Sequence, residues 1–138
     1  MKGERMKEID IKQGYVYHIK DLYFETVKDD KLMRNREGGA FRPAYFCIKE
    51  ERTRLLWVIP MSLRIDKYQA IIGKDIERHG KCLKIIIGEY ANRLTAFLLQ
   101  NMFPLLPKYI DHIHMIQQNP VPVANNSGQE FQGCYAAT

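Results

Sequence analysis

The sequence lacks many features that mark common classes of protein. Its 138 residues include only three cysteines, Cys47, Cys82 and Cys134, and no C-x-x-C pair. Widely spaced cysteines of odd number argue against a disulfide framework and against a zinc site, and Cys47 and Cys82 are expected in the core. No apolar run approaches the roughly 20 residues of a membrane-spanning helix. The charged first residues are followed by no apolar stretch of a secretory signal. We therefore expect a cytoplasmic protein without a membrane segment.

Motifs of several enzyme classes are missing as well. The sequence holds no G-x-S-x-G, no Walker loop and no G-x-G-x-x-G, which argues against serine hydrolases and common nucleotide-binding sites. His112 and His114 would share one face of a strand, but two imidazoles lack the third and fourth ligand of a zinc site. We therefore expect no metal site and no cofactor.

Positive charge is in modest excess. The chain has 21 Lys and Arg against 16 Asp and Glu, a formal net charge of +5. Such an excess is compatible with a polyanionic partner, but many basic domains bind nothing acidic. Charge alone leaves both possibilities open.

Short runs of β-forming residues dominate the chain and predict strands, whereas helical spacing of apolar residues predicts two helices. The expected strands are residues 15–19, 44–48, 55–61, 82–88, 94–99 and 111–116. The expected helices are residues 22–27, with Asp21 as N-cap, and residues 65–73, with a single helical turn at residues 107–110. Residues 31–42 are expected to form a basic loop, and residues 74–81 a charged one.

These elements predict an α+β domain with a curved antiparallel sheet or a small barrel as its core. The domain is expected to cover residues 14–116. Residues 1–13 are expected to be a leader and residues 117–138, which hold prolines and polar residues without periodicity, a flexible tail.

One stretch offers the best candidate chemistry. Residues 55–61 form an apolar run near a proline, and Ser62 and Arg64 follow at the start of an expected helix. A helix N-terminus with a hydroxyl and an arginine nearby is suited to bind an anion. The alternative is structural, with Ser62 as the helix cap and Arg64 as a solvated side chain. If the anion is a phosphate of RNA, the neighbouring ribose hydroxyl can be the nucleophile, and the protein supplies mainly positioning and charge.

Basic and aromatic residues elsewhere could complete such a site if they converge. Aromatic side chains interleaved with basic ones suit single-stranded RNA, although many of the eight tyrosines are expected to pack in the core. The candidates are Lys20, Tyr23, Arg42, Lys67 and Tyr68.

The order of several motifs resembles a known family. The motifs are residues 14–24 (GYVYHIKDLYF), 42–45 (RPAY), 57–68 (WVIPMSLRIDKY), 97–104 (FLLQNMFP) and 108–110 (KYI). Each motif is weak alone, but the ordered set, over residues 14–116, resembles the endoribonuclease toxins of type III toxin–antitoxin systems, the ToxN/AbiQ and CptN/TenpN-like toxins.

The resemblance implies a curved-sheet core similar to that of the Kid/MazF toxins. It implies metal-independent cleavage of RNA that leaves a 2′,3′-cyclic phosphate and a 5′ hydroxyl. It also implies a partner, a small structured RNA antitoxin derived from repeats, which occupies the active-site groove and assembles with the toxin into closed rings. Such systems stop growth or abort phage infection.

The resemblance also implies roles for individual residues. Ser62 matches the family's active-site serine, Tyr23 matches an active-site tyrosine, and Arg64 matches a basic residue that is lysine in ToxN. We expect Ser62 and Arg64 to bind the scissile phosphate and Tyr23 to orient the ribose or relay a proton. Because a guanidinium rarely gives up a proton, Arg64 would act through its charge alone. The residues expected to hold RNA backbone or bases are Lys20, Arg42, Lys67, Tyr68, Gln100 and Asn101.

Two other functions are compatible with the same residues. The basic surface could hold a structured RNA without any chemistry, as a non-catalytic RNA-binding module. Alternatively, the chain could be a small protein-interaction domain whose basic face is incidental. Salt-dependent binding of RNA distinguishes the first from the second.

Overall fold

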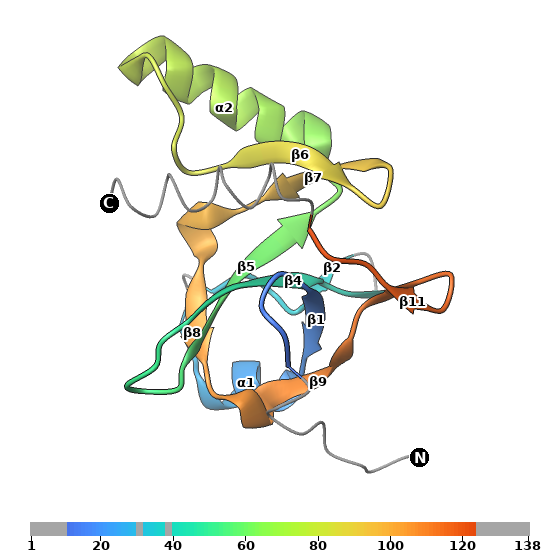
Figure 1. Ribbon diagram of the computed structural model, residues 1–138. Coiled ribbons are helices and arrows are strands. Elements are labelled where there is room, and N and C mark those ends of the chain that lie inside the picture. The colour runs from blue at the N-terminus through green and yellow to red at the C-terminus, as the bar shows by residue number, and fades with distance from the viewer. Residues whose placement is uncertain (1–10, 30–31, 38–39, 124–138) are drawn as a thin grey trace.

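The computed structural model describes residues 11–29, 32–37 and 40–123, which form an α+β fold (Figure 1). A seven-stranded sheet has the order β6-β7-β5-β4-β1-β9, with β8 paired to β5, and all of its pairings are antiparallel. The expected fold class and antiparallel sheet are confirmed. In the described part of the chain the end strands β6 and β9 do not pair, so the sheet is not a closed barrel. None of the described helices has the length and apolar character needed to cross a membrane.

The elements follow one another in short steps. The strands of the large sheet are β1 (Val16–Ile19), β4 (Ala44–Lys49), β5 (Leu56–Ser62), β6 (Ile86–Tyr90), β7 (Arg93–Phe97), β8 (Phe103–Leu105) and β9 (Ile110–Ile113). Two small hairpins consist of β2 (Arg36–Glu37) with β3 (Ala40–Phe41), and β10 (Met115–Ile116) with β11 (Asn119–Pro120). The helices are α1 (Asp21–Thr26) and α2 (Ile65–His79), with 3-10 turns at Leu99–Asn101 and Pro107–Tyr109.

Strand β5 is the centre of the sheet. Its first half pairs with β8, its last two residues pair with β7, and β4 follows its other edge. Pro60 lies inside the strand, as the expected range of residues 55–61 requires, between Val58, which pairs with β8, and Met61, which pairs with β7. A proline has no N–H to donate, and it is tolerated where the ladder changes partner. The strand therefore continues to Ser62.

Successive residues of β5 contribute to opposite faces of the sheet. Val58 belongs to one core cluster with Tyr17 and Phe46, whereas Ile59 belongs to a second cluster with Phe97. A strand that is buried on both faces is expected to be a continuous apolar run rather than an alternating one. This explains why the sequence of β5 holds so few polar residues.

Helix α2 is longer than expected. It continues through Gly73 and ends at His79, where Gly80 adopts the left-handed conformation with φ of 77°. A glycine with positive φ is a strong helix stop, whereas a glycine within a helix only weakens it. In Figure 1 the helix lies beside β6 and β7, and Tyr68 from α2 packs with Ala96 and Leu98.

Helix α1 begins differently from the expectation. Its N-cap is Lys20, and no described side chain caps this end. Asp21 instead accepts a hydrogen bond from Asn35 Nδ2 at 3.0 Å, and the same amide donates to the carbonyl of Ile19 at 2.8 Å. Asp21 therefore fastens the segment before β2 to the start of α1.

Several strands differ from the sequence prediction. The hairpin of β6 and β7 is shifted along the chain, because Ala91 and Asn92 both have positive φ, of 52° and 65°, and form its turn. Strands β8 and β11 each contain a proline and were missed, and β2 with β3 lies within the expected loop of residues 31–42.

The structure describes only part of the predicted leader and of the predicted tail. Residues 117–123, assigned to the tail, include β11 and the buried Val123, whose N–H donates to the carbonyl of Gly14 at 2.8 Å. Residues 1–10 of the expected leader and residues 124–138 lie outside the described residues. Cys47 is in the core as expected, where burial raises the pKa of its thiol to about 12. Cys82 is half-buried, and Cys134 is not described.

Candidate active site

Ser62 lies where β5 gives way to α2. Its side chain is buried, with 3% exposed, and its Cα pairs with Ala96 of β7. Its Oγ accepts a hydrogen bond from the backbone N–H of Arg64 at 3.1 Å. Arg64 itself is the N-cap residue, and no side chain in the described ranges caps this helix end. The expectation that Ser62 is a conventional helix cap is therefore wrong, because its partner is the N–H before the helix rather than one inside it.

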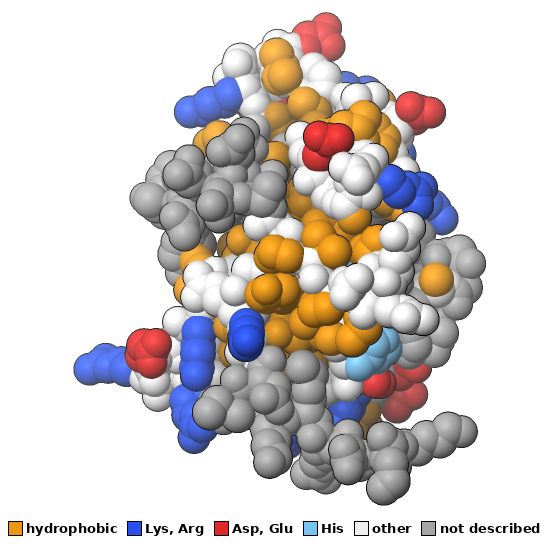
Figure 2. Space-filling model, turned by 45° about the vertical axis from the view of Figure 1, so that its right-hand side comes forward, with side chains coloured by type: hydrophobic (Ala, Val, Ile, Leu, Met, Phe, Trp, Pro, Cys, Tyr) orange, Lys and Arg blue, Asp and Glu red, His pale blue; other side chains and the backbone are white. Residues whose placement is uncertain are grey.

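Ser62 also forms part of the wall of a pocket of about 470 Å³. The pocket extends from the end of β5 to the β6–β7 hairpin and to the residue between β9 and β10. Most of its lining is apolar, including Pro43, Leu63 and Ile116. The polar lining residues are Ser62, Tyr90, Arg93, Thr95 and His114. Figure 2 shows one face of the molecule, on which hydrophobic side chains form a band with histidine and basic side chains at its borders.

Tyr90 and Thr95 hold the hairpin side of this pocket. The hydroxyl of Tyr90 donates to the carbonyl of Val121 at 2.7 Å and thereby ties β6 to the segment after β11. Burial raises the pKa of this phenol to about 12, so it stays a neutral donor at physiological pH. Thr95 donates to the carbonyl of Arg93 at 3.2 Å. Both side chains are thus fixed by the protein itself.

Three histidines meet beside the pocket. His18 of β1 and His114 have ring nitrogens, Nε2 and Nδ1 respectively, only 2.7 Å apart. The ring of His112 stacks on His18 with centroids 4.5 Å apart and an interplanar angle of 15°. Sequence alternation had placed His112 and His114 on one face of a strand, and both indeed contact His18.

Burial and mutual repulsion keep two of these histidines neutral. Burial first, and then the neighbouring His112 and His114, lower the pKa of His18 from 6.5 to about 4, while Asp111 opposes the shift. Burial, followed by His112, also lowers the pKa of His114. At pH 7 both rings are therefore uncharged, and one of the two facing nitrogens donates to the other, according to the tautomer of each ring.

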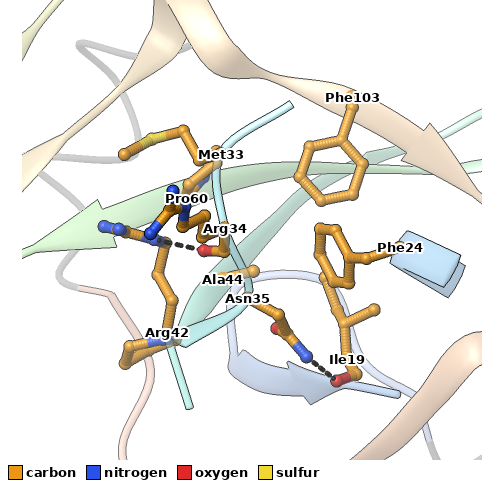
Figure 3. A pocket seen from close by; sticks show the side chains of 10 residues that line it. Ile19, Phe24, Met33, Arg34, Asn35, Arg42, Ala44, Pro60 and Phe103 are labelled. Carbon is orange, nitrogen blue, oxygen red and sulfur yellow. Dashed lines mark hydrogen bonds between the residues drawn. The ribbon is translucent and has the colours of Figure 1, made fainter. Parts of the chain in front are cut away.

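Arg42 lies close to Ser62, as the site hypothesis requires. Its Nη1 donates to the carbonyl of Met61 at 3.2 Å, one residue before Ser62. Its Nε donates to the carbonyl of Arg34 at 3.0 Å, and Figure 3 shows this bond beside a second, smaller hollow that Arg42, Asn35 and Phe24 help to line. The structure thus brings Arg42, Ser62 and Arg64 to one end of β5.

Tyr23 lies elsewhere in the fold. Its ring packs in the core, stacked on Phe103 with centroids 5.4 Å apart, and its hydroxyl donates to the carbonyl of Pro104 at 2.9 Å. Burial is the main cause that raises its pKa. Pro104 pairs with Trp57, five residues before Ser62 on β5, which corresponds to roughly 16 Å along an extended strand. The structure does not bring Tyr23 to Ser62.

The remaining RNA-binding candidates are spread over three regions. Lys20 is the N-cap residue of α1, and its carbonyl accepts the N–H of Tyr23 at 3.1 Å. Lys67 is exposed on the first turn of α2, with its ammonium 5.3 Å from the ring centroid of Tyr68, which is itself buried in the core. Gln100 and Asn101 form the 3-10 turn between β7 and β8. Of this set, Lys67 lies nearest in sequence to the start of α2.

The sequence interpretation missed the neighbours that the fold brings to Ser62. His114, Arg93, Thr95 and Tyr90 are 28 to 52 residues away along the chain, and only the pairing of β5 with β7 and of β1 with β9 brings them together. The one available signal was the polar alternation of residues 111–116, which indicated that both histidines share a face. It did not indicate that His18 lies opposite them.

The described residues contain no group of three His, Cys, Asp or Glu side chains arranged to hold a metal ion. Comparison with models of known protein families found no match to this chain, and neither did a search of curated proteins.

Proposed function

We propose that this protein is an endoribonuclease that cleaves RNA by attack of a ribose 2′ hydroxyl on the adjacent phosphate. The observation that carries the proposal is the position of Ser62, on the wall of a large pocket where β5 meets the N-terminus of α2. Arg64 follows it, and Arg42 is fixed to the residue before it. A buried hydroxyl, a helix N-terminus and two arginines form a suitable environment for a phosphate.

The pocket also suits the rest of a nucleotide. Its apolar lining offers a surface for a base or ribose, and its volume of about 470 Å³ falls within the range of small-molecule sites. In the proposed reaction, the 2′ oxygen forms a bond to phosphorus while the bond from phosphorus to the 5′ oxygen breaks. The products are a 2′,3′-cyclic phosphate and a 5′ hydroxyl. Ser62 and Arg64 stabilise the charge that develops on the phosphate oxygens.

The proposal includes the biological setting that the motif order implies. The chain would be the toxin of a type III toxin–antitoxin system in the cytoplasm, with a sheet core similar to the Kid/MazF toxins. A structured antitoxin RNA would occupy the same pocket in a ring-shaped assembly and inhibit cleavage. The physical support for an RNA partner is the basic character of the chain, which has a net charge of +5. Neutralisation of phosphates by basic side chains dominates the affinity of proteins for RNA.

The test is direct cleavage of RNA in the presence of EDTA. We expect the parent chain to produce fragments that end in a 2′,3′-cyclic phosphate, and we expect Ser62→Ala to reduce the rate by about 100-fold or more. Thr26→Ala is a matched control, because Thr26 is an exposed hydroxyl on α1 that donates to the carbonyl of Leu22. This control is expected to cleave at the parent rate.

Three results would contradict the proposal. If Ser62→Ala cleaves as fast as the parent, the active site lies elsewhere. If the parent binds RNA in a salt-dependent manner but leaves it intact, the chain is a non-catalytic RNA-binding module. If it binds no RNA even at low salt, the protein-interaction alternative is favoured.

A further inference from the structure

His114 is the pocket residue best suited to move a proton. Among the described residues that line the pocket, it alone carries an imidazole, and Ser62 lines the same pocket. Arginine holds its proton too tightly to act as a base at neutral pH, and Tyr90 donates its hydroxyl to Val121. A neutral imidazole beside a phosphate site is a common general base.

We propose that His114 removes the proton from the attacking 2′ hydroxyl and that His18 is its positioning residue; this inference rests on the proposed cleavage of RNA. His114 Nδ1 is held 2.7 Å from His18 Nε2. In the tautomer that the reaction requires, His114 Nδ1–H donates to His18, and Nε2 keeps its lone pair for the substrate. A base that is oriented by a second group through its other nitrogen is the general arrangement of catalytic histidines.

The proposed reaction begins with a proton transfer at the 2′ hydroxyl. The 2′ oxygen gives its proton to His114 Nε2 and forms the bond to phosphorus. The bond between phosphorus and the 5′ oxygen breaks, and its electron pair stays on that oxygen, which takes a proton from water. His114 then returns its proton to the hydroxide that remains. No oxidant, reductant or other co-reactant is required.

The groups around His114 favour the neutral form of its ring, which is the form that can accept a proton. His18 approaches from β1, His112 and Asp111 lie on β9, and Tyr90 and Arg93 belong to the β6–β7 hairpin. Burial and His112 lower the pKa of His114 below 6.5. A base with a lowered pKa is active above that pKa and is lost as the pH falls through it. The rate of cleavage should therefore fall on the acid side of pH 6.5.

The experiment measures kcat/KM for RNA cleavage as a function of pH in the parent and in variants of all three histidines. We expect His114→Ala to lower kcat by about 100-fold or more, to abolish the acid limb, and to recover activity when free imidazole is added. His18→Phe keeps a ring in the core but loses the hydrogen bond to His114. In this variant kcat should fall, and the pH below which the rate decreases should change. His18→Gln, which can again hydrogen-bond to His114, should restore part of the activity.

His79→Ala is the matched control. Its ring is exposed on the last turn of α2 and does not line the pocket, so kcat is expected to stay at the parent value. His112→Ala instead probes the pKa of the base, because His112 contacts His18 and lowers the pKa of His114. With this repelling group removed, the fall of the rate at low pH should move toward pH 6.5. A loss of kcat in His79→Ala equal to that in His114→Ala would overturn the assignment.

A second measurement does not depend on catalysis. In an NMR titration of the folded chain, His114 should titrate below pH 6.5, and its resonances should shift when uridine 3′-monophosphate is added. Full activity of His114→Ala beside an inactive Ser62→Ala would overturn the role of His114 and leave the endoribonuclease proposal intact. No cleavage by the parent chain would overturn both, and an unperturbed His114 signal with the nucleotide would overturn the role of His114 alone.

Discussion

Arg42 donates a hydrogen bond from Nη1 to the carbonyl oxygen of Met61 across 3.2 Å. Its next neighbour, Pro43, accepts the N–H of Met61 at 3.0 Å. The segment before β4 is therefore joined twice to the residue that precedes Ser62. Any movement of this segment would shift the end of β5, so we expect Arg42 to position Ser62 in addition to supplying charge.

Arg42→Lys is expected to lower stability and cleavage even though the charge is kept. A lysine has a single ammonium and cannot reach the carbonyls of Met61 and Arg34 together, as the guanidinium does. The loss of one such bond corresponds to about 1 kcal/mol of the free energy of unfolding. Denaturant unfolding and RNA cleavage measure the two effects, with the exposed Arg52→Lys as control. If Arg42→Lys unfolds and cleaves RNA as the parent does, the positive charge of Arg42 is sufficient and its two hydrogen bonds are not needed.

Tyr23→Phe is expected to lower stability and to leave cleavage nearly unchanged. The substitution keeps the ring on Phe103 but removes the donor to the carbonyl of Pro104, which corresponds to about 1 kcal/mol. Because the hydroxyl is directed to Pro104, its loss should change kcat/KM by less than about threefold. Thermal unfolding measures the loss of stability, and the cleavage assay measures the change in kcat/KM. A large loss of cleavage at native stability would instead support the catalytic role that the resemblance implies for Tyr23.

The fold was largely accessible from the sequence because its strongest patterns are local. Continuous apolar runs predicted β4 and β5, and the β-rich residues 15–19 predicted β1. The errors arose at glycines and prolines, whose effect depends on the backbone conformation and the strand position that they occupy. Gly73 does not end α2, because an exposed glycine weakens a helix without stopping it, whereas Gly80 stops it through its left-handed backbone. The short β8 was missed because Pro104 argues against a strand, although β8 lies beside β5 as a short outer strand.

Arg64→Ala is expected to weaken RNA binding in a manner that depends on salt. Its side chain is exposed at the start of α2, so it would contact phosphate through charge. Removal of one phosphate contact should reduce the slope of log affinity against log salt by about 0.7 for single-stranded RNA. Arg64→Lys should keep the slope. Arg78→Ala, at the far end of the same helix, is the control. An unchanged slope in Arg64→Ala would show that this residue contacts no phosphate.

The site was less accessible than the fold. The sequence indicated Ser62 and Arg64 because they are adjacent to a strong apolar run, and Arg42 because the motif RPAY resembles a known one. The residue that we propose to transfer the proton was beyond such reasoning. His18 and His114 are 96 residues apart and meet only because β1 and β9 are antiparallel neighbours, a pairing that no local pattern of hydrophobicity specifies.

Glu50 and Trp57 close the hairpin between β4 and β5. Trp57 Nε1 donates to Glu50 Oε1 at 2.6 Å, and the hydroxyl of Thr53 donates to Glu50 Oε2 at 2.7 Å. Hydrogen bonds from Thr53 and then from Trp57 lower the pKa of the Glu50 carboxyl below 4.5. The carboxylate form is thus favoured in the folded protein.

The pH dependence of this contact can be followed through Trp57, which is the only tryptophan of the chain. Because the folded pKa of Glu50 is below the unfolded value, its contribution to stability is complete above pH 4.5 and is lost as the pH falls through the folded pKa. We expect Trp57 fluorescence to change with a midpoint below pH 4.5. Glu50→Gln keeps an acceptor oxygen without a titrating carboxyl and should abolish this transition, whereas the exposed Glu51→Gln should preserve it. A transition that persists in Glu50→Gln would mean that another group controls the environment of Trp57.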